Sequence, residues 1–260
     1  MNRVAFGEGL FVAVGASGTI LTSTNGLQWI QQDAGVSSDL EGAAMGTVNS
    51  HLLAVVVGDE GTLLTSTNGS DWTRQDLELT NDLLGVGFCA GQFIVVGTDG
   101  TILTSPDGVA WQRQASPVRY DLWSVAYGAG FFVAVGSEGA LVTSSDGVNW
   151  TQWLVDASVT CYEVTFANGA FWTVGESGTL LASDPLVHLR WMSFADALVG
   201  LQGPGGRFYR IEATDRLGVS TDWTWQTMWY LPSNSPPETP LTLPNLSGPK
   251  QQFLRATLIP

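Results

Sequence analysis

A chain of 260 residues with 44% apolar side chains can bury a sizeable core, and its length fits one or two domains. Its ten basic residues, with Lys250 the only lysine, face 24 acidic ones, which gives a formal net charge of −14. Such an acidic chain repels the phosphates of nucleic acids and of anionic membrane surfaces, so we expect neither as a partner.

No apolar run is long enough for a transmembrane helix, so no membrane span is predicted. Residues 1–6 are like a weak signal peptide, but residues 10–15 recur later as a core strand, so this segment belongs to the fold. Cys89 and Cys161 fall in the third and fifth copies of the repeat described below, which are not neighbours, and we therefore predict free thiols.

A ladder of glycines shows that the chain is built from repeats. In each copy one glycine ends an apolar run and a second follows three residues later; the first glycines are separated by 43, 39, 39 and 39 residues. A period of about forty residues is typical of the four-stranded blades of a β-propeller. The ladder consists of Gly15, Gly58, Gly97, Gly136 and Gly175.

The fourth copy shows the strands of one unit most clearly. Short apolar runs at residues 122–127, 131–135, 140–144 and 150–154 are separated by Gly-, Asn- and Asp-containing turns, which is the pattern of successive hairpins. We therefore predict an all-β fold, a five-bladed β-propeller of four-stranded blades over residues 1–196, followed by a small β module.

The turn between the third and fourth strands carries the strongest motif, Ser-x-Asn/Asp-Gly-x-x-Trp. Its Asn or Asp can accept hydrogen bonds from nearby backbone amides, and Asn-Gly and Asp-Gly favour the positive φ of tight hairpins. We predict that the Trp packs between blades and that the whole motif is structural. Its members are Ser23, Asn25, Gly26, Trp29, Ser66, Asn68, Gly69, Trp72, Ser105, Asp107, Gly108, Trp111, Ser144, Asp146, Gly147 and Trp150.

This motif resembles the Asp-box, or bacterial-neuraminidase-repeat, in a variant with one residue fewer between Asp and Gly. The repeats over about residues 3–194 are similar to sialidase-like propellers, to photosystem II assembly factors and to exported or phage-tail proteins. The resemblance implies a propeller whose binding face lies opposite the boxes. Neuraminidases of the family use an arginine cluster, a Tyr–Glu pair and an Asp; no arginine here sits at repeated blade positions that would converge on the axis, so we predict no catalytic residues and no enzyme.

The fifth copy departs from the motif and marks the end of the array. Residues 183–186 read Ser-Asp-Pro-Leu without the glycine, and Trp191 comes two residues late. Residues 197–260 resemble the C-terminal β module of secreted bacterial repeat proteins, with strands expected at 208–213, 223–229 and 252–256 and a long loop at 233–249. The alternative is that these strands complete a sixth blade.

Acidic residues recur in the turns between the second and third strands. Because successive strands alternate in direction, these turns share one face, opposite the boxes, with inter-blade loops that hold Asp39 and Glu41 among other acids. The residues are either a solvated rim that keeps the protein soluble or a docking face for a basic partner or cations. The candidates for binding are Asp59, Glu60, Asp99, Glu138 and Glu176.

Other chemistry is poorly supported by the sequence. His51 and His188 are isolated, and no nucleophile elbow, P-loop or dinucleotide fingerprint occurs, so no metal site and no cofactor is predicted. We expect a non-catalytic binding or scaffold propeller, outside the cytoplasm, whose partner is another protein or a larger assembly, with a cation or glycan as further ligands. The alternatives are a glycoside hydrolase of the sialidase-like class and a structural subunit of a surface, phage-tail or photosynthetic complex.

Overall fold

In the computed structural model the chain divides into two compact units. One comprises residues 1–166 and 172–182, and the other residues 167–171 and 183–260. The structure describes residues 1–154 and 159–183, together with the strands 188–193, 198–202, 207–214, 224–231, 239–242 and 253–259. All statements below concern these residues, and each unit is treated by itself.

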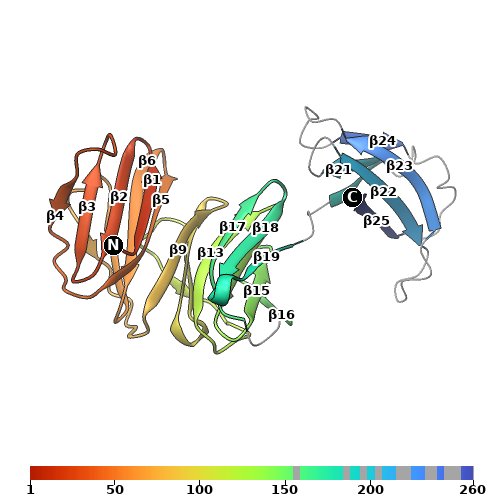
Figure 1. Cartoon of the computed structure of the whole chain (residues 1–260). Helices are drawn as coiled ribbons and strands as arrows, with labels where there is room; N and C mark the ends of the chain where they lie inside the picture. The colour runs from red at the N-terminus through yellow and green to blue at the C-terminus, as the bar shows by residue number, and fades with distance from the viewer. Residues whose placement is uncertain are drawn as a thin grey trace. The chain divides into compact units, whose positions relative to one another are not determined.

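The first repeats form four-stranded antiparallel sheets, the blades, which follow one another along the chain (Figure 1). The first blade consists of β1 (Arg3–Gly7), β2 (Leu10–Gly15), β3 (Thr19–Ser23) and β4 (Ile30–Gln32). The second consists of β5 (Leu40–Val48), β6 (His51–Gly58), β7 (Thr62–Ser66) and β8 (Thr73–Arg74). The third consists of β9 (Leu83–Cys89), β10 (Gln92–Gly97), β11 (Ile102–Ser105) and β12 (Gln112–Arg113). The fourth consists of β13 (Leu122–Gly128), β14 (Phe131–Gly136), β15 (Ala140–Ser144) and β16 (Thr151–Leu154).

The fifth blade has three strands, β17 (Cys161–Ala167), β18 (Ala170–Gly175) and β19 (Leu180–Ala182). The five sheets confirm the predicted five-bladed fold. In every blade the short apolar runs become strands, and positive-φ residues, such as Glu60 with Gly61 or Asp99 with Gly100, make the turns between the second and third strands.

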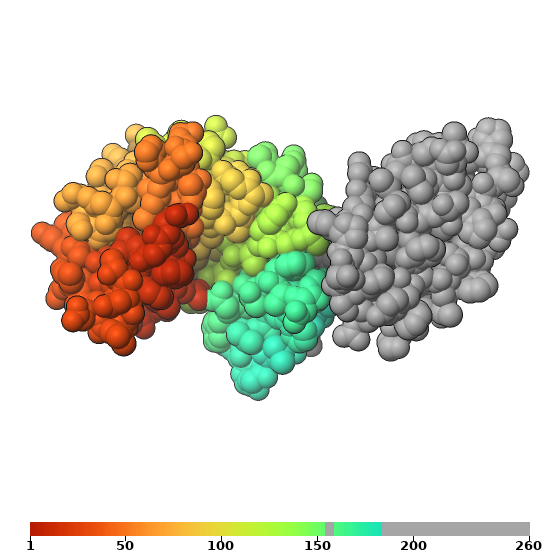
Figure 2. All heavy atoms as spheres, turned by 90° about the horizontal axis from the view of Figure 1, so that it is seen from above, coloured from red at the N-terminus to blue at the C-terminus, as the bar shows by residue number. Residues whose placement is uncertain are grey.

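The first strands of neighbouring blades lie against one another, β1 on β5, β5 on β9 and β9 on β13. Figure 2 shows the blades in chain order around a common centre, with the first (red) next to the fifth (teal). These two blades are joined at their first strands, because Arg3 of β1 forms an ion pair with Glu163 of β17. Glu163 also accepts a hydrogen bond of 2.8 Å from the Ser124 hydroxyl of β13.

The apolar core lies between blades and consists of one cluster at each of the first three interfaces. Side chains alternate between the two faces of a strand, so each middle strand contributes to the clusters on both sides. For example, Val12, Val14 and Ile20 of the first blade pack with Leu40 and Leu64 of the second. The next two interfaces repeat this arrangement with Val55 and Phe93, and with Ile94 and Phe132, respectively.

The Ser-x-Asn/Asp-Gly-x-x-Trp turns, called box turns here, share one hydrogen-bond pattern. In the first, Ser23 Oγ accepts from the Gly26 amide at 2.9 Å, and Asn25 Oδ1 accepts from the amides of Leu27 and Gln28, each at 2.9 Å. The indole of Trp29 donates to the Gly26 carbonyl at 3.1 Å. The turns at Ser66, Ser105 and Ser144 repeat these bonds.

The box tryptophans differ in burial according to the blade that precedes them. Trp150 is 9% exposed, whereas Trp29 is 38% exposed. The box glycine of a later blade lies against the preceding blade, as Gly108 does against Leu53, whereas Gly26 meets only Phe11 of its own blade. Among the described residues, no other blade therefore lies against the box glycine of the first blade.

The strand β20 (His188–Ser193) does not complete the fifth blade. It pairs with β21 (Leu198–Gln202). The sequence predicts instead that the propeller, with its fifth repeat, extends to residue 196. In the sequence, Pro185 and Leu186 stand where the other copies have Asn or Asp and Gly, so the turn that would return the chain as a fourth strand lacks its usual residues.

The second unit contains two three-stranded sheets. One has the order β20-β21-β24, with β24 Thr239–Thr242, and the other the order β23-β22-β25, with β22 Arg207–Thr214, β23 Thr224–Leu231 and β25 Phe253–Ile259. The three strands expected from the sequence correspond to β22, β23 and β25, and β24 lies within the segment expected to be a loop. Neither sheet is a four-stranded blade in the described part of this unit.

Replacing a box tryptophan by alanine will lower the free energy of unfolding, and the loss will be larger where the side chain is more deeply buried. We expect Trp150→Ala to lower the free energy of unfolding by about 3–5 kcal/mol, the usual cost of truncating a buried aromatic side chain. Trp29→Ala, with no blade over it, should cost about 1–2 kcal/mol, and the half-buried Trp111 should fall between. Urea unfolding of the three variants measures this order; equal losses at Trp29 and Trp150 would contradict it.

The acidic box turns make stability depend on pH. Hydrogen bonds from the amides of Ala110 and Val109 lower the pKa of Asp107, and bonds from the Asn149 amide and side chain lower that of Asp146. A lowered pKa in the folded state means that this stability is present above the unfolded pKa of about 3.9 and is lost as the pH falls further.

Asp107→Asn with Asp146→Asn should therefore flatten the acid side of the stability profile. Asn25 and Asn68 fill the same position in the first two blades, so the amide can accept the same bonds. We expect little change at pH 7 and a smaller loss of stability between pH 5 and pH 2 than in the wild type. Urea unfolding across this range measures the slope, and an unchanged slope would show that other carboxyls dominate it.

Candidate binding face opposite the box turns

The candidate face is formed by two kinds of turn that lie at the same end of the blades. One kind joins the second and third strands of a blade, and the other leads from one blade into the first strand of the next. The two kinds are bonded together: the backbone oxygen of Asp39, at the start of β5, accepts from the Asp59 amide at 2.9 Å. Asp121 and Ser137 repeat this bond at 2.9 Å.

An aspartate at the start of a blade also connects it to the blade before. Asp39 Oδ1 accepts from the Ser17 amide at 2.8 Å and Asp82 Oδ1 from the Glu60 amide at 2.9 Å, both over a separation of 22 residues. Asp121 makes the same bond to Asp99 at 3.2 Å. These aspartates are thus part of the fold as well as of the negative charge on this face.

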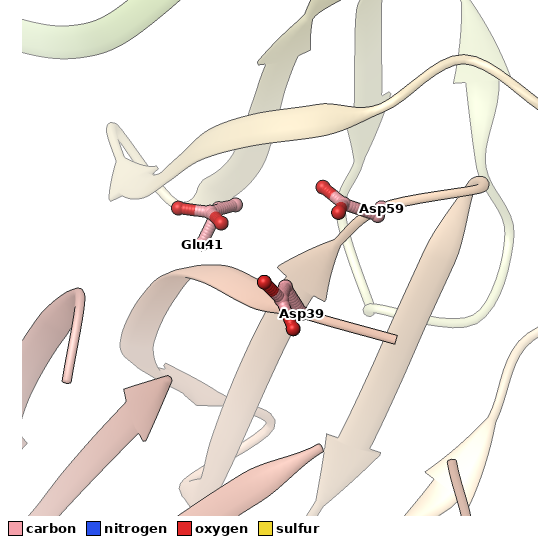
Figure 3. A group of neighbouring side chains, drawn as sticks. All are labelled: Asp39, Glu41 and Asp59. Carbon is pink, nitrogen blue, oxygen red and sulfur yellow. The ribbon is translucent and has the colours of Figure 1, made fainter. Parts of the chain in front are cut away.

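Three carboxyl groups converge at the second blade. Oxygens of Asp39, Glu41 and Asp59 lie within 4.8 Å of one another, and all three side chains are half-buried. Figure 3 shows them approaching from the start of β5 and from the turn after β6. Burial and the neighbouring acids raise the pKa of both Glu41 and Asp59.

The convergence favours a positively charged ligand. Carboxylate oxygens are ligands for hard cations such as Ca²⁺ and also accept paired bonds from a guanidinium group. The cluster has little positive charge of its own: Asn2 donates to Glu41 at 3.1 Å, and Arg3, which lowers the Glu41 pKa, is paired with Glu163. A bound cation would relieve the repulsion that raises these two pKa values.

An aromatic group occupies the equivalent position at the fourth and fifth blades. Glu41, Trp123 and Tyr162 each follow the buried residue that begins a first strand. The rings of Trp123 and Tyr162 are 5.9 Å apart and nearly perpendicular, at 82°. The Tyr162 hydroxyl donates to Glu176 at 3.1 Å, and this bond raises the pKa of Tyr162.

The five acids singled out in the sequence occupy two different positions in the turns. Glu60, Asp99 and Glu138 are at the tips, with φ of 56°, 55° and 53°. Asp59 and Glu176 are one residue earlier, and the structure brings Asp59 to Glu41 and Glu176 to Tyr162. The sequence places Glu41 on this face without including it among the candidates for binding, and it does not single out Tyr162. Aligning the first strands of the repeats puts Tyr162 at the position of Glu41.

Comparisons with known proteins show the fold. No family model and no curated protein matches the chain. A solved structure described as YCF48 bound to D1 peptide aligns with a TM-score of 0.55 and 17% identity over 86% of this chain and 79% of that one. YCF48 from Cyanidioschyzon merolae gives 0.55 and 18% over 80% of each chain. The Pan2 WD40 domain of Neurospora crassa gives 0.54 and 11% over 77% and 71%.

The chain is a β-propeller. The identities are low, so the likeness extends to the arrangement of strands and not to the site. In the described part of the chain, no helix has the length and apolar character needed to cross a membrane.

The inter-blade aspartate bond is missing at one interface and can be restored. Thr160 stands 22 residues after Glu138, where the preceding blades have Asp39, Asp82 and Asp121. Thr160→Asn supplies a side-chain oxygen for the Glu138 amide and should raise the free energy of unfolding by about 0.5–1.5 kcal/mol. Thr160→Ala, which adds no acceptor, is the control; urea unfolding in which both variants match the wild type would show that the bond does not form.

Proposed function

We propose that this chain is a non-catalytic binding propeller of the Asp-box type that holds a basic segment of a partner protein on the face opposite the box turns. The observation that carries the proposal is the cluster of Asp39, Glu41 and Asp59. Three half-buried carboxyls converge there without a lysine or arginine ion pair among the described residues. A basic side chain supplies the missing charge and bidentate hydrogen bonds.

The rest of the face fits a peptide better than a bare ion. The aromatic pair of Trp123 and Tyr162 offers ring surface to a second residue of the peptide, and arginine binds such faces as well as carboxylates. The net charge of −14 attracts a basic segment at long range. A structural neighbour holds a peptide, which supports the same use of this fold here. The resemblance of residues 197–260 to modules of secreted proteins supports a place outside the cytoplasm.

The test is a library of short fluorescent peptides with a fixed central arginine. Binding is measured by anisotropy, at low and high salt, for the wild type and for Glu41→Gln with Asp59→Asn. The double variant removes two charges from the cluster and keeps Asp39, which bonds to the Ser17 amide. We expect affinity to fall about tenfold in this variant and also to fall with salt.

The matched control is Glu8→Gln with Asp71→Asn. It removes the same charge from exposed residues in turns at the opposite end of the blades. Equal binding by the wild type and the cluster variant, or equal losses in both double variants, would contradict the proposal. Calorimetry with Ca²⁺ is the second arm: calcium binding that the cluster variant loses, without any peptide binding, would identify the site as a cation site instead.

The Tyr162–Glu176 hydrogen bond favours a second candidate function, a sialidase-like glycoside hydrolase. A Tyr–Glu pair is the nucleophile of that class in the family that the repeats resemble. Here the bond to Glu176 raises the pKa of Tyr162, which disfavours the phenolate. Arg3, on the first strand of the first blade, is engaged by Glu163. Hydrolysis of a fluorogenic sialoside that Tyr162→Phe abolishes would establish this candidate over the binding function.

A further inference from the structure

The third strand of the fifth blade is exposed where the other blades bury the same strand. Leu180 and Leu181 are 61% and 39% exposed, whereas Leu63 and Leu64, at the same positions of the second blade, are fully buried. The third blade resembles the second, with Ile102 at 0% exposure. The sequence of β19 is as apolar as that of the buried third strands. Its greater exposure therefore comes from the lack of neighbouring elements packed on it.

One part of the missing cover is a fourth strand. The outer edge of each other third strand is paired: the amide of Gln75 donates to the Leu63 carbonyl and that of Gln114 to the Ile102 carbonyl, both at 2.9 Å. On β19 the corresponding backbone groups belong to Leu180 and Ala182, because Leu181 is opposite Thr173 of β18. No described strand pairs with this edge.

The edge lacks the features that protect the outer strands of the second and third blades. β8 and β12 are two residues long and each contains an arginine, and short charged edges discourage further pairing. β19 has the sequence Leu-Leu-Ala, with neither charge nor proline. Its open edge is therefore an acceptor for an added β-strand.

The face of the sheet beside this edge is apolar and exposed as well. Val174 of β18 is 48% exposed, while Val14, its counterpart in the first blade, is fully buried. Val174 is directly opposite Leu180, so the two side chains share one face. At the periphery, Figure 2 shows an open notch between the fifth (teal) and first (red) blades.

We propose that the outer edge of β19 binds an extended segment of a partner protein as the fourth strand of the fifth blade. The segment is apolar at alternate positions, to cover Val174 and Leu180, and carries basic residues at its ends. The charge of −14 selects this occupant, because a second copy of the chain is repelled and a basic segment is attracted.

The structure also specifies one side chain of the segment. In the first three blades a glutamine of the fourth strand bonds to a threonine of the third, as Gln75 does to Thr65 at 2.9 Å. Ala182 stands in place of this threonine in the fifth blade. This glutamine lies opposite the residue two positions before the threonine, as Gln32 lies opposite Ile20. The residue of the segment opposite Leu180 is therefore apolar, because an amide there has no hydroxyl to bond.

The probe is a fluorescent peptide with alternating valine and threonine and a lysine at each end, added to the full chain. Hydrogen exchange should show slower exchange of the Leu180 and Ala182 amides with peptide, and anisotropy should give saturable binding. Ala182→Pro removes one outward amide from an edge strand, where proline is tolerated. We expect it to weaken binding roughly two- to tenfold, the value of one backbone hydrogen bond.

Three controls separate this surface from the face opposite the box turns. Leu181→Lys should weaken binding of the peptide, whereas Leu27→Lys, the same substitution at an exposed leucine of a box turn, should not. Glu41→Gln with Asp59→Asn should retain the peptide's protection of Leu180. Absent binding, unchanged binding by Ala182→Pro with a native circular dichroism spectrum, or a stable dimer by light scattering that the peptide does not dissociate, would each overturn the proposal.

Discussion

The structure depends on apolar contact between neighbouring blades. Each sheet is apolar on both faces, as Val12 and Ile20 on one side of the first blade and Phe11 on the other illustrate. A single four-stranded sheet cannot bury two faces by itself, so a blade is stable only between two others. The box turn, the inter-blade aspartates and the glycines of the turns all serve to hold one blade at the distance where these faces meet.

The sequence predicts most of the propeller because its signals are local and repeated. Asn25 and Asp107 fix their own turns through backbone amides two and three residues away, so the motif alone indicates the geometry. The three-stranded fifth blade could not be read in the same way. Whether Trp191 returns to that blade or joins another sheet is decided by pairing between distant strands, and the local pattern contains no information about it.

For the candidate face, the sequence predicts which end of the blades the acids occupy but not which residues meet there. The turn acids could be assigned to one end of the blades from the alternation of strand directions alone. Their grouping depends on register: Asp59 meets Glu41, and Glu176 meets Tyr162, because the first strands are aligned by their pairing with the second. Repeats that share a backbone thus differ in what they display there, with carboxyls at the second blade and rings at the fourth and fifth. This asymmetry distinguishes the blades from one another on this face.

The junction between the first and last blades has a mechanical consequence. At the first three interfaces neighbouring blades share an apolar cluster, whereas at this junction the first strands are joined by the partly exposed ion pair of Arg3 and Glu163. Exposed ion pairs yield little resistance compared with the burial of several aliphatic side chains. Tension that pulls these two blades apart would therefore open the circle at this junction while each sheet stays folded. The sheets would remain connected in chain order, and the same ion pair could form again once the load is removed.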